Sequence, residues 1–160
     1  MMTRPEFEDC LLRVAHAWRG VGFLHNGRTK SQGVDCLGLI VCIFREVGII
    51  VPDGDGKTYS TDWYLHTPEE RYLSALLAYG TPVDKNELLM GDVPYFRPGV
   101  LAPAKSPAIT HGGIYLGEGT FIHSINGRGV DIGVLSHRAW VVSYAGASRP
   151  LAVSAALGDT

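Results

Sequence analysis

The 160 residues include 14 Lys and Arg against 16 Asp and Glu, a formal net charge of −2, and 46% of the residues are hydrophobic. This composition predicts a folded globular chain without the basic excess of a nucleic-acid-binding protein, so we expect no nucleic-acid partner. The longest uninterrupted apolar run, Leu39 to Phe44, is too short to cross a bilayer, so we expect no membrane span.

Two helices are predicted in the N-terminal third of the chain. The first covers 5–19, because Pro5 suits an N1 position and apolar residues follow at helical spacing. The second covers 36–47, between Asp35 as N-cap and Gly48 as the C′ residue. The residues before the first helix lack the apolar core of a secretory signal, which predicts synthesis in the cytoplasm without a signal peptide.

The rest of the chain changes from a helical to a strand-like pattern. Residues 51–63 predict a surface loop, and Thr67 predicts the start of a helix that ends at Gly80. Short apolar runs between glycines and prolines then predict antiparallel strands, so the fold class is α+β. The predicted strands lie near 92–97, 110–116, 120–126, 129–134 and 140–147, with a proline-rich loop at 98–107. We expect one catalytic domain over 1–150 and a poorly ordered tail over 151–160.

One cysteine, Cys36, lies where a thiol becomes reactive. It follows the predicted N-cap Asp35, and the positive end of a helix dipole favours thiolate over thiol. The alternative is a small apolar residue at the start of a buried helix. Without any Cys-x-x-Cys pair, the three cysteines predict neither a disulfide framework nor a zinc site, and we expect no metal and no cofactor.

A thiolate nucleophile needs a base, and the base needs an orienting partner. His111 and His123 flank a predicted hairpin whose turn is Gly117–Gly119. If the turn has three residues, both histidines project to one face at about 7–8 Å between backbones. Gly113, without a side chain, then leaves room for the two rings. A turn of two or four residues places them on opposite faces, and two strand histidines without a joint role are the alternative.

Three motifs occur in an order that identifies a family. They are Gly33–Leu39 around Cys36, Gly91–Phe96, and Thr110–Gly117 followed by Phe121–Ser124. Over roughly residues 10–149 the chain resembles the NlpC-type cell-wall cysteine peptidases of the papain-like superfamily. The resemblance implies N-terminal helices packed on an antiparallel sheet of about five strands, with the nucleophile at the N-terminus of a buried helix.

The resemblance also assigns roles to individual residues. Cys36 is then the nucleophile, and its backbone N–H is an oxyanion donor. His111 is the general base, and His123 orients it. The implied substrate is a peptidoglycan stem peptide, often cleaved between D-glutamate and a diamino acid, and Asp35 is a candidate for holding a free substrate amine.

Two substrate-side positions depart from the family pattern. Phe23 stands where the family usually has a tyrosine whose hydroxyl supports the oxyanion, and one lost oxyanion donor typically costs about 10²–10³ in turnover. Leu37 replaces the usual serine after the nucleophile, which affects stem-peptide specificity. With Asp35, these two residues form the predicted substrate-binding set.

The compact chain and the segment Tyr59 to Leu73 resemble the phage-tail branch of the family. That branch implies a peptidase carried on a virion tail, with tail-tip proteins as partners and the cell wall as its site of action. Two other functions remain open: a weakly active or inactive tail-tip structural component of the same fold, and a papain-like acyltransferase or amidase.

Overall fold

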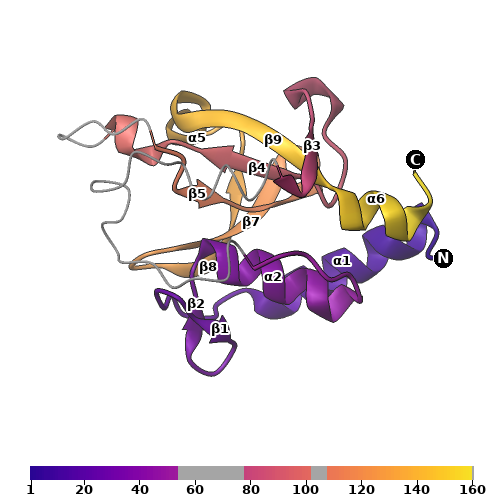
Figure 1. Cartoon of the computed structure of the whole chain (residues 1–160). Coiled ribbons are helices and arrows are strands. Elements are labelled where there is room, and N and C mark those ends of the chain that lie inside the picture. Colours follow the sequence, from indigo (N-terminus) through magenta and orange to yellow (C-terminus); the bar gives the residue numbers. More distant parts are fainter. Residues whose placement is uncertain (54–77, 102–107, 160) are drawn as a thin grey trace.

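The computed structural model describes residues 1–53, 78–101 and 108–159, and two long helices precede a series of strands (Figure 1). Most of the predicted loop at 51–63 and of the helix predicted from Thr67, and part of the loop at 98–107, lie outside these residues. The elements are α1 (Arg4–Trp18), β1 (Arg28–Thr29), β2 (Gly33–Val34), α2 (Cys36–Val47), β3 (Gly80–Pro82), η1 (Lys85–Glu87), β4 (Val93–Phe96), η2 (Pro98–Leu101), β5 (His111–Gly112), β6 (Ile114–Gly117), β7 (Thr120–Ile125), β8 (Gly129–Val134), α5 (Arg138–Ser143), β9 (Tyr144–Pro150) and α6 (Leu151–Leu157).

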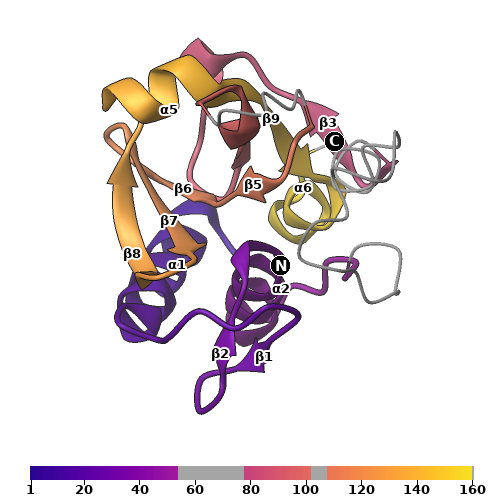
Figure 2. The ribbon, with the colours of Figure 1, turned by 90° about the vertical axis from the view of Figure 1, so that its left-hand side faces the viewer.

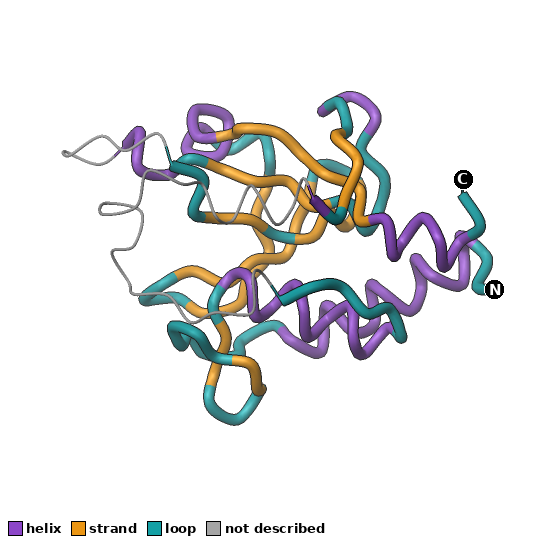
Figure 3. The backbone as a smooth tube through the Cα atoms, in the orientation of Figure 1, coloured by secondary structure: helices purple, strands orange, loops and turns teal. Residues whose placement is uncertain are grey.

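Both predicted N-terminal helices are present. A capping box between Thr3 and Glu6 starts α1 one residue earlier than Pro5 predicted. Helix α2 matches its prediction at both ends, because Asp35 accepts a hydrogen bond from Gly38 N–H at the start and Gly48 adopts a left-handed conformation at the end. Most of α2 is buried against α1 and the strands. Figure 3 shows the two long helices, in purple, lying alongside each other.

The strands form two larger antiparallel sheets and one short pair. The first sheet has the order β3-β9-β4-β5, the second β6-β7-β8, and β1 pairs with β2 (Figure 2). The predicted strand at 110–116 is divided at Gly113, where the chain passes from one sheet to the other. Gly113 N–H donates to the Pro94 carbonyl of β4 at 3.1 Å and Tyr115 N–H to the Asp92 carbonyl just before β4 at 2.8 Å, so the two sheets stay joined there. This is the α+β architecture predicted from the sequence, with one sheet replaced by two.

The β6–β7 hairpin carries His123 and directly follows His111 on β5. Its strands pair in the predicted register, although its turn differs from the prediction. Ile114 pairs with Ile122 and Tyr115 with Phe121, which is the predicted register. The turn itself is shorter, because Gly117 pairs with Thr120 and a bulge restores the register between Tyr115 and Gly117. A Cβ atom on Gly113 would lie 2.4 Å from the Ile122 carbonyl oxygen, so only glycine allows this close approach.

Two predictions for the C-terminal region were wrong. The strand predicted at 140–147 begins as helix α5, because the His137 side chain caps Ala139 N–H and Ser143 Oγ bonds back to the Ala139 carbonyl. The strand β9 starts only at Tyr144. The tail predicted as poorly ordered contains α6, whose Val153 is buried in the main core. An ion pair of 2.7 Å between Arg4 and Asp159 then ties the C-terminal end to the start of α1.

The helices that the structure describes were compared with the requirements of a membrane span. Among residues 1–53, 78–101 and 108–159, no helix has both the length and the hydropathy that a membrane span requires.

Candidate active site

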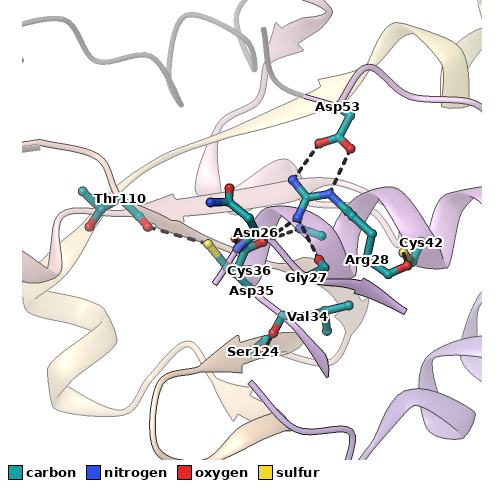
Figure 4. A network of polar contacts seen from close by, with 11 residues as sticks. Asn26, Gly27, Arg28, Val34, Asp35, Cys36, Cys42, Asp53, Thr110 and Ser124 are labelled. Atoms are coloured by element: carbon teal, nitrogen blue, oxygen red, sulfur yellow. Dashed lines mark hydrogen bonds and ion pairs between the residues drawn. The ribbon is translucent and has the colours of Figure 1, made fainter. Parts of the chain in front are cut away.

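Cys36 is the first residue of α2, and its side chain is half-buried at the junction between that helix and β5. The thiol donates a hydrogen bond of 3.6 Å to the Thr110 carbonyl oxygen, and Figure 4 shows the sulfur directed toward this group. Thr110 directly precedes His111 in the sequence. The fold therefore brings Cys36 to the strand that carries His111, across 74 residues of sequence.

Asp35 organises the loop in front of the nucleophile. Its buried carboxylate accepts hydrogen bonds from Gly38 N–H at 2.8 Å, Asn26 N–H at 2.8 Å and the Arg28 guanidinium at 3.1 Å (Figure 4). Arg28 in turn makes a two-point contact with Asp53. Both oxygens of Asp35 thus bind groups of this chain. Its predicted role in holding a substrate amine stays a prediction, and one oxygen would have to be shared for it.

His111 and His123 are in direct contact, as the same-face prediction required. His111 Nε2 lies 2.9 Å from His123 Nδ1, and their rings meet edge to face. The geometry fits a His111 Nε2–H that donates to an unprotonated His123 Nδ1. In that tautomer His111 Nδ1 carries the lone pair, and it is the nitrogen left to take a proton from Cys36.

A buried hydroxyl connects the histidine strand to the nucleophile loop. Ser124, next to His123, donates a 2.7 Å hydrogen bond from Oγ to the Val34 carbonyl. Leu24 N–H donates to the same carbonyl, and Val34 N–H donates to the Gly22 carbonyl. Two residues before Cys36, the backbone is therefore fixed from both sides. The sequence analysis did not find this role of Ser124, because a single serine after a strand histidine carries no pattern.

Burial keeps both histidines neutral. Desolvation, and secondarily the neighbouring His123, lowers the pKa of His111 from 6.5 to about 3. Desolvation likewise lowers the pKa of His123 to about 4, opposed by the charge of Asp131 and assisted by that of Arg128. At neutral pH His111 is therefore unprotonated and has a lone pair free to accept a proton, and a negative charge developing on Cys36 or on the substrate would stabilise the imidazolium that forms.

The neutral pair predicts a loss of stability in acid. In the unfolded chain both rings take up a proton near pH 6.5, whereas in the folded chain they do so only near pH 3–4. Between these values the unfolded state holds more protons, so the free energy of unfolding falls as the pH falls. We expect a loss of about 2 kcal/mol per histidine between pH 7 and pH 5, measured by urea unfolding.

Two variants make this measurement specific. His123→Asn removes one of the two rings and should reduce the loss by about half, whereas His16→Gln, at an exposed position of α1, should leave it unchanged. The lowered pKa values of Glu6 and Asp131 start from 4.5 and 3.8, so these carboxylates titrate mainly below the chosen window. Equal losses in all three proteins would contradict the assignment to the histidine pair.

The structure places the other two predicted substrate-side residues near the nucleophile loop. Phe23 is half-buried in the segment whose neighbours Gly22 and Leu24 bond to Val34. Leu37 is partly buried and packs on the main core beside Cys36. Their predicted contacts with a substrate stay predictions.

An aromatic residue that sequence analysis did not single out completes the surroundings of the histidines. Trp140, in α5, stacks on His111 with ring centroids 5.2 Å apart and meets His123 edge to face at 5.0 Å. Its place in a predicted strand concealed it. Only the observed packing of α5 brings it to the site.

Metal binding finds no support at this site. Among the residues that the structure describes, no three His, Cys, Asp or Glu side chains are grouped so that they could hold an ion. The three cysteines, all within the described ranges, carry free thiols.

Comparison with known proteins identifies the family. The model of the NlpC/P60 family matches residues 20–149. A probable endopeptidase NlpC homolog of Haemophilus influenzae is 29% identical over 143 residues, which cover 89% of this chain and 62% of that protein. A gamma-DL-glutamyl hydrolase of Bacillus subtilis is 29% identical over 140 residues, which cover 87% of this chain and 28% of that protein.

A solved structure agrees with these sequence matches. The crystal structure of an NlpC/P60 family protein from Bacillus cereus has a TM-score of 0.65 and 28% identity, over 90% of this chain and 40% of that chain. This chain thus spans 62% or less of the length of the relatives and the structure compared. Because the family model covers most of the sequence and the solved structure shares its fold, the chain belongs to the NlpC/P60 family.

Proposed function

We propose that this protein is a cysteine endopeptidase that hydrolyses amide bonds in the stem peptides of peptidoglycan. One observation carries the proposal: the Cys36 thiol bonds to the Thr110 carbonyl, and the next residue, His111, is bonded to His123. A nucleophile at a helix start, a neutral base and an orienting group are the three parts that thiol catalysis requires.

The first half of the reaction forms a thioester. His111 Nδ1 takes the thiol proton as Cys36 Sγ attacks the carbonyl carbon of the scissile amide. The negative charge on the carbonyl oxygen develops near the positive end of α2, which stabilises it. The C–N bond then breaks, and the His111 imidazolium gives its proton to the leaving amine. Throughout the reaction, His123 Nδ1 accepts a hydrogen bond from His111 Nε2–H and so keeps His111 Nδ1 as the nitrogen that exchanges the proton.

The second half releases the acid product. His111 removes a proton from a water molecule, whose oxygen attacks the thioester carbonyl. The C–S bond breaks, the thiolate recovers its proton from His111, and the product leaves as a carboxylic acid, which then loses its remaining proton to solvent. Up to this release the chain supplies every proton acceptor, and each proton taken up is returned.

We propose the bond between D-glutamate and the diamino acid as the cleaved bond. The motif resemblance supports this choice, and so does the name of the Bacillus subtilis relative, a gamma-DL-glutamyl hydrolase. The departures at Phe23 and Leu37 fall at positions that the motif resemblance assigns to substrate binding.

Digestion of purified wall fragments tests the proposal. Fragments of defined stem-peptide chemistry are incubated with the wild-type protein and with Cys36→Ala, and the products are identified by mass spectrometry. We expect a new free amine on the diamino acid and a new carboxylate on D-glutamate, both absent with Cys36→Ala. Cys10→Ser, at a half-exposed cysteine of α1, is the matched control and should cleave normally.

The products also separate the competing functions. A new adduct on an added amine or alcohol, in place of a free carboxylate, would identify an acyltransferase. The absence of any cysteine-dependent product from every wall type would favour an inactive structural component of the same fold. The departures at Phe23 and Leu37 are the observations that motivate this alternative.

We also propose that the peptidase acts from a phage tail or tail-like particle. The support is the resemblance of Tyr59 to Leu73 to the phage-tail branch, a segment that includes no described residue. Particles carrying Cys36→Ala should assemble but fail to infect walled cells. Normal infection by such particles would contradict a catalytic role on the tail.

A further inference from the structure

Trp140 touches both histidines of the proposed triad, and none of the motifs above accounts for it. Its indole lies nearly parallel to the His111 ring, with an interplanar angle of 19° and centroids 5.2 Å apart. The same indole meets the His123 ring at 75° and 5.0 Å. One side chain therefore restricts the orientation of both rings whose nitrogens share the 2.9 Å contact.

A second aromatic set holds Trp140 in this place. Phe96 lies 5.0 Å and Phe121 lies 5.5 Å from its ring, and both belong to the smaller of the two buried clusters. Phe96 on β4 is paired directly with His111 on β5 and also contacts its ring. The indole, in turn, is carried by α5, in which the backbone N–H of Trp140 donates to the His137 carbonyl. Trp140 is half-buried, both histidines are buried, and the indole covers one face of the His111 ring.

We propose that Trp140 is a positioning residue for the catalytic histidines. Its indole holds the His111 ring in the orientation that directs Nε2 at His123, and it keeps water from that hydrogen bond. The expected effect of Trp140 on catalysis rests on the proposed function. Its expected effect on the orientation and pKa of the two rings does not. Trp140 does not act on the substrate; it acts through His111 and His123.

The indole has two opposing effects on the charge of His111. Its face favours a cation, by about 0.5–2 kcal/mol in typical cases, whereas the water that it excludes would favour a cation more strongly. Burial is the first cause of the lowered pKa of His111, and on this ground we expect the exclusion of water to outweigh the attraction of the ring face. Removing the indole should therefore raise the pKa of the histidine pair.

Other groups face this pair and must be held constant. Asp131 on β8 raises the pKa of His123, and Arg128 before β8 lowers it. Cys36 of α2 bonds to the carbonyl of Thr110, the residue before His111, and Tyr144 of β9 lies in the same aromatic cluster beside Phe96. None of the proposed substitutions changes these four residues.

Three substitutions at Trp140 test the proposal in the full chain. Trp140→Ala removes the ring and its cover, Trp140→Phe keeps a flat ring, and Trp140→Leu keeps apolar volume without a flat ring. Val141→Ala, at a half-exposed neighbour in α5, is the matched control. The first readout is the NMR titration of isotope-labelled histidine rings, and the second is the pH profile of kcat/KM on a stem peptide.

We expect Trp140→Ala to raise the pKa values of His111 and His123 by about one unit or more. The acid limb of kcat/KM should move to higher pH, and kcat/KM at pH 7 should fall about tenfold. Trp140→Leu should show the same fall at pH 7 with a smaller pKa change, and Trp140→Phe and Val141→Ala should stay within about threefold of wild type.

Equal titration curves and activities for Trp140→Leu and Trp140→Phe would overturn the proposal, even if Trp140→Ala failed to fold. If the wild type cleaved no stem peptide, the proposed function would fail, but the ring titrations would still show whether Trp140 sets the state of the histidine pair. The two failures are therefore distinguishable.

Discussion

Replacing His111 with alanine should lower kcat/KM on a stem peptide on the order of 10⁴-fold, whereas His123→Asn should lower it less than about tenfold. His111 is the only group of the proposed triad that both accepts and returns a proton. His123 acts through one contact, from Nδ1 to His111 Nε2 at 2.9 Å. Histidine Nδ1 and asparagine Oδ1 stand at equivalent positions beyond Cβ, so asparagine can accept the same hydrogen bond.

Two further substitutions at His123, which change the position of the acceptor atom or remove it, serve as controls. His123→Gln places its oxygen one carbon farther out, and His123→Ala has no acceptor, so both should lose about 10²-fold through misorientation of His111. Steady-state kinetics at pH 7 on one substrate compares the four variants. If His123→Asn were as inactive as His111→Ala, His123 would have to take part in proton transfer itself.

Asp35→Ala should be the most destabilising substitution in the nucleophile loop, with a loss of about 3–5 kcal/mol in the free energy of unfolding. The buried carboxylate accepts hydrogen bonds from Gly38 N–H, Asn26 N–H and the Arg28 guanidinium. Alanine has no acceptor, so all three donors lose this hydrogen bond. Replacement of a helix cap alone costs about 0.5–2 kcal/mol. Urea unfolding at pH 7 measures the difference.

A second capping aspartate provides the comparison. Asp84 caps the short helix η1 through Asn86 N–H at an exposed site, so Asp84→Ala should lose about 1 kcal/mol or less. Asp35→Ser retains a capping oxygen and should fall between the two. Similar losses for Asp35→Ala and Asp84→Ala would show that the contacts to Asn26 and Arg28 add nothing to the cap.

The nucleophile helix and the histidine hairpin were predictable because local signals determine them. Asp35 and Gly48 mark the two ends of α2 by side-chain capping and by left-handed backbone, and neither depends on distant residues. In the hairpin, alternation fixed the common face of His111 and His123. The turn was predicted with one residue too many, and the bulge before Gly117 compensated for the error.

Other elements depend on distant contacts and were not predictable in the same way. The run Trp140-Val141-Val142 has high strand propensity, yet it forms α5, where Trp140 packs on the distant cluster of Phe96 and Phe121. The C-terminal helix α6 is short and is retained through the burial of Val153 in the main core. The contact between Trp140 and both histidines follows from α5 and is therefore visible only in three dimensions.

The ion pair between Arg4 and Asp159 has a consequence for the engineering of this chain. It places the two ends of the backbone side by side, at the end of the molecule opposite β2 and the start of α2 (Figure 1). A linker of a few residues therefore suffices to close the backbone into a ring. Such a circular chain could be reopened at the exposed turn of Asn126 and Gly127, which would give a permuted order of the same elements around an unchanged triad.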